Sequence, residues 1–169
     1  MENLTRQEIS INLEVMDMLN EQIEKEQKAS SVYLAMASWC DQRTLINSAT
    51  FFYKQAEEER EHMMKIFKFI NDTGGSAYSP NVSGITHEFS SLREIFETAL
   101  QHEIAITQSI YKIVAKCRTV NDFGSENFLM WFVEEQLEEE ETIKDILDMF
   151  DLSGDMPLQY IDERIPVDK

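Results

Sequence analysis

Apolar residues recur along most of this chain at alternating steps of three and four, the spacing that gathers side chains on one face of an α-helix. Four such stripes follow one another along the sequence. They run over residues 16–40, 52–70, 92–117 and 129–150. Glycine and proline together number only eight, which is too few for a turn-rich β fold. The pattern therefore predicts an all-α chain with four long helices.

Short polar segments separate the helices of each predicted pair. Residues 41–44 interrupt the pattern after the first stripe, and residues 119–124 interrupt it after the third. The second helix is expected to begin at Asn47 or Ser48, because both side chains are favourable N-caps. Short loops place consecutive helices side by side and antiparallel. The chain is therefore expected to form two helical hairpins.

A long connection over residues 74–90 joins the two hairpins. It holds three of the five glycines and one of the three prolines. Ser91 and Glu94 have the spacing of a capping box at the start of the helix that follows. A crossover that runs the length of a four-helix bundle, and joins two helices pointing the same way, accounts for a connection of this length.

The predicted architecture is a single domain over residues 1–169. Its four-helix bundle spans about residues 12–151. Gly154 and Pro157 then stop the last long helix. In the C-terminal segment 152–169, residues 158–164 are expected to form a short fifth helix.

The charge of the chain narrows the classes of partner. With 32 acidic and 15 basic residues, the formal net charge is −17. This charge argues against nucleic acid or an anionic membrane as a partner and favours cations. The first residues show no basic segment followed by an apolar one, so we expect a cytoplasmic protein. Cys40 and Cys117 form neither a disulfide framework nor a CxxC metal motif.

Each apolar stripe contains a polar residue at a position where core is expected. These residues are Glu26, Glu59, Glu103 and Gln136. In an antiparallel hairpin, two residues face one another when their numbers sum to twice the centre of the loop. Glu26 and Glu59 sum to 85, against about 86 expected, and the other pair sums to 239, against about 242. Both pairs are separated by 33 residues, which indicates that all four meet at one level of the bundle.

Each second helix adds another polar side chain one turn further on. His62 follows Glu59 by three residues, and Glu139 follows Gln136 by three, which places each pair on one helix face. Buried carboxylates lose their hydration and repel one another, so they need compensation. The four glutamates of this group would balance two divalent cations. Oxygen ligands with one imidazole suit iron, manganese or zinc.

A simpler interpretation exists for each acidic run taken singly. Residues 57–62 and 134–141 could be solvated helix faces, and a lone ExxH pair is a weak motif. The agreement of positions and spacings in both hairpins favours the metal site. We expect His87, in the crossover, and His102, beside the third stripe, to be ordinary surface residues.

Four stretches of the sequence together resemble a known family. They are LNEQIEKEQKASSVYLAMASWC (19–40), AEEEREHM (56–63), SSLREIFETALQHEIAITQSI (90–110) and NFLMWFVEEQLEEEE (127–141). The chain resembles the ferritins, and most closely the bacterial non-haem ferritins, over nearly its whole length after roughly ten residues. The resemblance implies a ferritin-like bundle with a di-iron carboxylate centre.

The resemblance also implies roles for individual residues. The residues that match ligands of the ferroxidase centre are Glu26, Glu59, His62, Glu103 and Gln136. The residues that match a third iron site, between the centre and the shell interior, are Glu58, Glu135, Glu138 and Glu139. Glu59 would bridge the two irons. Tyr33 matches a tyrosine beside the centre and is the candidate catalytic residue, whereas Trp131 is expected mainly to pack in the core.

The sequence differs from related families at positions that would bind iron or haem. Oxygenases and reductases of this fold usually carry an ExxH pair in both hairpins, whereas the second hairpin here has Gln136 and Glu139. An amide and a more open ligand set suit a site that releases iron after oxidation. Bacterioferritins place a haem-ligating methionine where this chain has Arg60, so no haem is expected.

The resemblance implies iron storage and detoxification as the function. Fe(II) would be oxidised by dioxygen or hydrogen peroxide at the centre and stored as a ferric oxide mineral. The mineral would lie inside a hollow homo-oligomeric shell of twenty-four subunits. Two alternatives stay open: a di-iron oxygenase or peroxide reductase with permanently bound metal, and a non-catalytic acidic bundle that binds other proteins.

Overall fold

The computed structural model describes residues 9–167 of the chain as five helices. They are α1 (Leu13–Asp41), α2 (Ile46–Asp72), α3 (Leu92–Val120), α4 (Phe123–Ser153) and α5 (Leu158–Asp162). No strand occurs in this part of the chain. The prediction of an all-α fold with four long helices and a short fifth one is confirmed.

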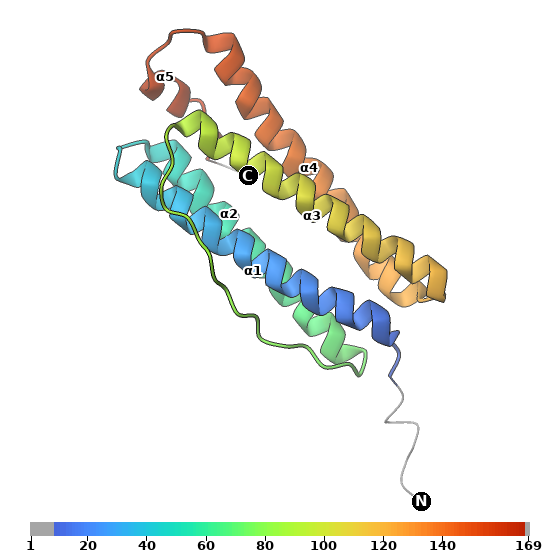
Figure 1. Cartoon of the computed structure of the whole chain (residues 1–169). Coiled ribbons are helices and arrows are strands. Elements are labelled where there is room, and N and C mark those ends of the chain that lie inside the picture. The colour runs from blue at the N-terminus through green and yellow to red at the C-terminus, as the bar shows by residue number, and fades with distance from the viewer. Residues whose placement is uncertain (1–8, 168–169) are drawn as a thin grey trace, which may run out of the picture.

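The long helices form two antiparallel hairpins that pack side by side. Figure 1 shows α1 paired with α2 and α3 paired with α4, with α1 lying against α3. Because α2 and α3 run in the same direction, residues 73–91 must return along the outside of the bundle, as the sequence predicts. The short α5 contacts α2 and α4 at the end where the crossover arrives.

Asp122 fastens the two hairpins together at the other end of the bundle. It caps α4 by accepting a hydrogen bond from the N–H of Ser125 at 3.0 Å. Its second oxygen accepts the N–H of Asn12 at 2.9 Å. Asn12 in turn caps α1 by accepting from the N–H of Glu14. A cap for each helix is thus part of one network.

The predicted N-cap of the second helix is wrong. The helix begins at Ile46, and its N-cap residue Leu45 makes no side-chain cap bond. The N–H groups of Asn47 and Ser48 instead donate to the carboxylate of Asp162 in α5, at 3.2 and 2.9 Å. An acid more than a hundred residues away therefore satisfies the first turn, which frees Asn47 and Ser48 to lie inside the helix.

The turn between α3 and α4 is shorter than the predicted segment 119–124. Only Asn121 and Asp122 lie outside the two helices. Asn121 adopts the left-handed conformation, with φ of 57°. Asparagine tolerates this conformation better than most residues, so it ends α3 abruptly without a glycine.

The predicted capping box of α3 forms in a modified way. Ser91 is the N-cap, and its hydroxyl accepts the N–H of Glu94 at 3.1 Å. The Glu94 carboxylate returns to the N–H of Ser90, one residue before the cap, at 2.6 Å. Both side chains therefore still satisfy backbone donors at the start of the helix.

The crossover is attached to α1 at both ends of its path. Near its start, the amide of Asn20 donates to the carbonyl of Ser76 at 3.0 Å and accepts the N–H of Tyr78 at 2.9 Å. Near its end, the indole of Trp39 donates to the carbonyl of Phe89 at 3.1 Å. These bonds explain how a segment without regular structure holds one course along the bundle.

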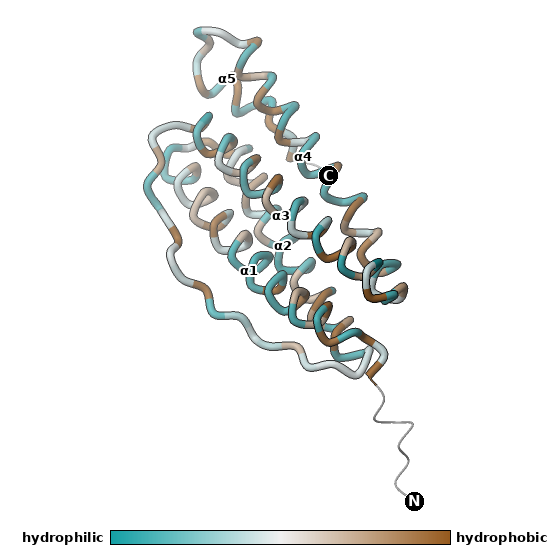
Figure 2. Tube along the Cα trace, turned by 45° about the vertical axis from the view of Figure 1, so that its right-hand side comes forward, coloured by the Kyte–Doolittle hydropathy of each residue, from teal (hydrophilic) through white to brown (hydrophobic). Residues whose placement is uncertain are grey.

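The core fills the space between the four long helices. Figure 2 shows hydrophobic and hydrophilic positions alternating along each helix, whereas the crossover is mostly pale or hydrophilic. The largest fully buried side chains include Tyr33, Phe52, Phe96 and Phe132. Within the described residues, no helix is long and apolar enough to cross a membrane. The core also encloses a group of polar side chains, which is the unusual feature of the fold.

Candidate metal centre

Six polar side chains from all four long helices are buried at the waist of the bundle. They are Glu26, Glu59, His62, Glu103, Gln136 and Glu139, none more than 4% exposed. Glu26 lies on α1 and Glu103 on α3. The other four lie on the second helix of each hairpin, two on α2 and two on α4. The structure thus places inside the bundle every residue that the sequence singled out for its principal metal site.

Glu26, Glu59 and His62 form a compact group with open ligand atoms. Nδ1 of His62 lies 4.0 Å from Oε2 of Glu26 and 3.9 Å from Oε1 of Glu59. Each residue offers one ligand atom, and these atoms lie within 4.8 Å of one another. Glu26 Oε2, both Glu59 oxygens and His62 Nδ1 are buried without a hydrogen bond. Unsatisfied buried polar atoms are rare and costly, and a cation between the three residues would satisfy one such atom of each.

Glu103 is in the opposite situation, because both of its oxygens accept hydrogen bonds. The hydroxyl of Tyr33 donates to Oε1, and Nε2 of Gln136 donates to Oε2 at 2.9 Å. Oε1 of Gln136 is buried without a hydrogen bond. Tyr33 therefore contacts the centre directly, and burial together with Glu103 raises the pKa of its hydroxyl well above the usual value.

Raised pKa values favour the protonated form of the buried carboxyl groups when the centre holds no metal. Burial raises the pKa of Glu26, and it raises that of Glu59 further because Glu103 and Glu26 carry like charges nearby. Burial raises the pKa of Glu103 to about 7, although the bond from Tyr33 opposes this. Burial lowers the pKa of His62 to about 4, so its ring is neutral at pH 7. Cation binding would therefore displace protons from carboxyl groups.

The four residues predicted for a third iron site lie at different depths. Glu139 is buried, close enough to Glu59 to raise its pKa. Glu135 is 29% exposed, and its Oε1 lies 4.0 Å from Nε2 of His62. Glu58 is half-buried and Glu138 is exposed. The assignment of these four to one iron site stays a prediction.

Trp131 packs against the centre from one side. Its ring meets that of His62 edge-on, with centroids 5.4 Å apart. Nζ of Lys65 lies 3.3 Å from the centroid of the Trp131 ring. Of the other two histidines, His87 is exposed and His102 is half-buried rather than on the open surface. The packing role expected for Trp131 thus includes contact with a candidate ligand.

The sequence pattern did not single out Gln22, which is hydrogen-bonded to the centre, or Ser109, which is hydrogen-bonded to Gln22. Nε2 of Gln22 donates to Oε1 of Glu26 at 2.7 Å, and the hydroxyl of Ser109 donates to Oε1 of Gln22 at 2.6 Å. Gln22 precedes Glu26 by one helical turn and lies beside the apolar stripe, which is a signal that sequence alone contains. Ser109 carries no comparable signal, because serine is common on helix surfaces.

The donor set fits a transition metal that prefers oxygen and nitrogen ligands. Carboxylates and one imidazole are ligands typical of iron, manganese and zinc, and the group contains no thiolate. The unpartnered atoms come from residues that repel one another in the absence of a cation. On geometry and charge, the centre is therefore suited to bind divalent cations.

Comparison with known proteins identifies the family. The model of the ferritin-like domain matches residues 16–153. The chain belongs to the ferritin family. It is 40% identical over 141 residues to a probable bacterial non-heme ferritin-like protein of Haemophilus influenzae, covering 83% of this chain and 86% of that one. It is 37% identical to the bacterial non-heme ferritin of Campylobacter jejuni, covering 86% of this chain and 87% of that one.

Solved structures of ferritins superpose closely on this chain. An open-pore ferritin from the hyperthermophilic archaeon Archaeoglobus fulgidus has a TM-score of 0.91 and 32% identity. The superposition covers 96% of this chain and all of the archaeal one. A form of the same ferritin engineered to be closed has a TM-score of 0.89. The ferritin fold therefore extends over nearly all of the chain.

Proposed function

We propose that this ferritin oxidises Fe(II) at the buried centre and stores the Fe(III) as a hydrous ferric oxide mineral inside a shell built from its own copies. Iron storage is the function that its family membership supports. The observation that carries the oxidation step is the cluster of buried atoms without hydrogen-bond partners on Glu26, Glu59 and His62. Iron here is the substrate and passes through the centre.

The ligands divide between two iron ions. Glu26 and His62 bind the first ion with one oxygen of Glu59, and the other Glu59 oxygen turns to the second ion. Glu103 and Gln136 complete the second position, and Glu139 lies nearby. Support comes from Glu59, whose two oxygens are both unpartnered and whose pKa is raised by carboxylates of both hairpins. Four carboxylates balance the charge of two Fe(II).

In the oxidation step each Fe(II) loses one electron, and both electrons go to one molecule of oxidant. Two Fe(II) supply two electrons, which reduce dioxygen with two protons to hydrogen peroxide, or reduce hydrogen peroxide with two protons to water. The bridging carboxylate stabilises the charge that develops as both ions become Fe(III). Tyr33 stays protonated, because the pKa of its hydroxyl is raised well above the usual value, and holds Glu103 in place.

Iron leaves from the second position. The amide of Gln136 is a neutral ligand and holds Fe(III) less firmly than a carboxylate or an imidazole would. Acidic side chains on α4 then offer the iron a route to the surface. Glu135 is partly exposed beside His62, and Glu138 is exposed one turn further along α4. The net charge of −17 supports attraction of cations to the shell. Location in the cytoplasm stays a prediction.

Stopped-flow mixing of metal-free protein with two Fe(II) per chain and dioxygen tests the proposal. We expect rapid oxidation of both ions and repeated turnover. The native protein should have the size of a twenty-four-subunit shell and should accumulate iron mineral. Light scattering on the native protein measures the size. A small oligomer that keeps two irons through turnover would instead favour the oxygenase or peroxide-reductase alternative. Absence of Fe(II) oxidation above the rate in buffer would leave only a binding role.

A further inference from the structure

A chain of three hydrogen bonds connects the molecular surface with the Glu26 carboxylate. Nζ of Lys25 donates to Oγ of Ser109 at 2.6 Å. The Ser109 hydroxyl donates to Oε1 of Gln22 at 2.6 Å, and Nε2 of Gln22 donates to Oε1 of Glu26 at 2.7 Å. Gln22 and Glu26 are completely buried, whereas Lys25 is exposed. We call these four residues the α1–α3 relay.

All donors in the α1–α3 relay point in one direction, from the cation to the carboxylate. Because an ammonium group only donates, Ser109 must accept from Lys25 and pass its own hydrogen onward. The carbonyl of the Gln22 amide takes that hydrogen, which leaves its NH₂ group for Glu26. Aligned hydrogen bonds polarise and strengthen one another. A side chain on α3 therefore determines which way an amide on α1 faces.

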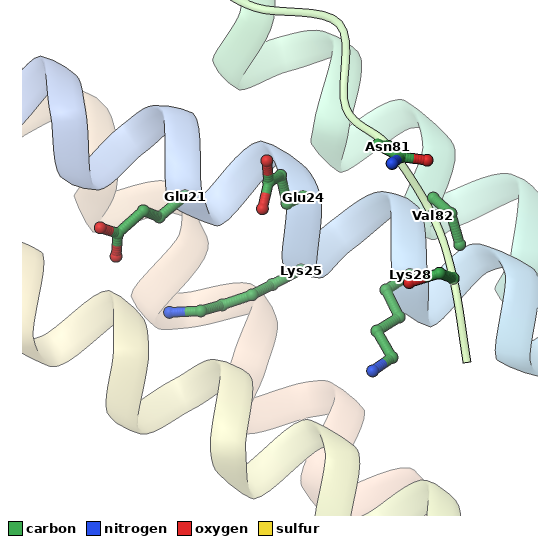
Figure 3. Close-up of a pocket in the computed structure, with 7 residues that line it drawn as sticks. Glu21, Glu24, Lys25, Lys28, Asn81 and Val82 are labelled. Carbon is green, nitrogen blue, oxygen red and sulfur yellow. The ribbon is translucent and has the colours of Figure 1, made fainter. Parts of the chain in front are cut away.

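The outer end of the relay is open to water, and its inner end is not. Figure 3 shows the Lys25 side chain extending from α1 toward the neighbouring helices. Lys25 also lines a surface depression of about 530 Å³ between α1 and the crossover, together with Glu24, Lys28 and Asn81. Lys25 is thus the exposed end of the relay, while the amide of Gln22 and the carboxylate of Glu26 are buried in the core.

The relay leaves the two oxygens of Glu26 unequal. Oε1 is occupied by Gln22, whereas Oε2 is unpartnered and lies 4.0 Å from Nδ1 of His62. We propose that Gln22 and Ser109 are positioning residues, which hold Glu26 so that only Oε2 faces the first metal position. Glu26 then binds through one oxygen. This inference rests on the proposed function, because it assumes that a cation binds between Glu26 and His62.

A purely structural role for the relay makes a different prediction. The relay joins α1 to α3, so breaking it would cost stability whether or not it acts on the metal. The distinguishing quantity is the state of the bound cation. Groups that orient a metal ligand typically change metal affinity by roughly 10- to 100-fold when they are removed, whereas loss of a remote buried hydrogen bond changes only the melting temperature.

The test compares Gln22→Met with wild type and with a matched control. Methionine keeps the length of the side chain and removes its donor. The control is Ser30→Ala on the same helix, which removes a buried hydrogen bond of 2.6 Å to the carbonyl of Ala56. Calorimetry with Zn(II) gives the affinity of the first position, visible absorption of bound Co(II) reports its geometry, and thermal unfolding of the metal-free protein gives stability.

We expect Gln22→Met to weaken the first Zn(II) ion by roughly 10-fold or more and to alter the Co(II) spectrum. Ser30→Ala should lower the melting temperature and leave both metal readouts as in wild type. If wild-type protein binds no Zn(II) at the centre, the proposed function fails. If wild type binds Zn(II) and Gln22→Met gives the same affinity and spectrum, only the positioning role fails.

Ser109→Ala keeps the inference testable even if Gln22→Met does not fold. This change removes the outer link and leaves the Gln22 amide free to turn, so a loss of roughly threefold in Zn(II) affinity is expected. In the double variant, Ser109→Ala should add little to the effect of Gln22→Met, because Ser109 acts through that amide. Fully additive losses, or an unchanged affinity in Ser109→Ala, would contradict the relay.

Discussion

The two halves of the buried centre differ in how their polar atoms are satisfied. In the first half, Glu26, Glu59 and His62 direct unpartnered atoms at one another across about 4 Å. In the second half, Glu103 accepts hydrogen bonds on both oxygens from Tyr33 and Gln136. The burial of the two halves is the same, so the contrast comes from the placement of donors and not from exposure to water.

This contrast has a consequence for metal binding. A cation entering the first half breaks no protein hydrogen bond to reach its ligands. A cation entering the second half must displace the amide of Gln136 from Glu103, or share Glu103 with it. The first half is therefore expected to bind the first ion more tightly, and the second half to bind and release iron more readily.

Glu59→Ala should impair both halves of the centre, because both depend on this residue. We expect the initial rate of Fe(II) oxidation to fall by roughly 100-fold, since the two ions lose their common ligand. The bundle should still fold, because a buried carboxyl with two unpartnered oxygens is removed. Stopped-flow absorbance measures the rate. Glu57→Ala, an exposed acid on the same helix, is the control, and a wild-type rate in Glu59→Ala would contradict the site.

The pH dependence of stability should reveal the protons held by the metal-free centre. The raised pKa values of Glu26, Glu59 and Glu103 mean that the folded state binds more protons than the unfolded chain above about pH 4.5. The free energy of unfolding therefore falls as pH rises, by about 1.4 kcal/mol per pH unit for each carboxyl within its window. For Glu103 this window ends at about 7.

His62 acts in the opposite direction over part of this range. Its lowered pKa of about 4 means that its contribution to stability increases with pH up to the ordinary value of 6.5 and is constant above it. The net loss of stability per pH unit should therefore be steepest between pH 6.5, where the contribution of His62 becomes constant, and about 7, where the Glu103 window ends. Melting temperatures of metal-free and Zn(II)-loaded protein across this range provide the measurement. Equal slopes for the two forms would show that the carboxyl groups are not neutralised by metal.

Gln136→Ala should increase the difference in metal affinity between the two halves, because it alters the second half alone. We expect the second ion to bind about 10-fold more weakly, with the first ion unaffected. Calorimetric titration with Zn(II) resolves the two steps, and Gln101→Ala, an exposed position on α3, serves as control. Two equivalent tight sites in Gln136→Ala would remove the distinction between the halves.

Tyr33→Phe should have the smallest effect and test whether the halves are independent. It removes one donor to Glu103, so the metal-free protein should lose about 1 kcal/mol of stability. Affinity for the first ion should not change. The same substitution at Tyr53, whose hydroxyl donates to Asp41 on the surface, should cost little stability. A first-ion affinity that falls in Tyr33→Phe would show that the halves are coupled.

Much of the centre could be predicted because helix periodicity and hairpin arithmetic are both properties of sequence. Glu26 and Glu59 were expected at one level, and the structure places both within about 4 Å of His62. Glu103 and Gln136 were expected to face one another, and they share a hydrogen bond. Their roles as iron ligands stay predictions, as does the third iron site.

The failures have a common physical cause. The start of α2 was misplaced because Asp162 of α5 caps it from the far end of the chain. The position of Gln22 beside the apolar stripe was visible in the sequence, but its hydrogen bond with Ser109 on another helix was not. Both contacts depend on how helices rotate and approach one another after packing. The pattern of residues along one helix does not determine how that helix rotates against its neighbours.

Residue spacing along the chain is enough to predict the helices, the crossover and the polar residues that face the core, because the spacing of side chains along a helix fixes their face. Which buried atoms have hydrogen-bond partners, and which stay open for a cation, depends on how the helices pack. That choice requires donors and acceptors from different helices to come within about 3 Å. Distances of this kind arise from packing, so they belong to the folded molecule.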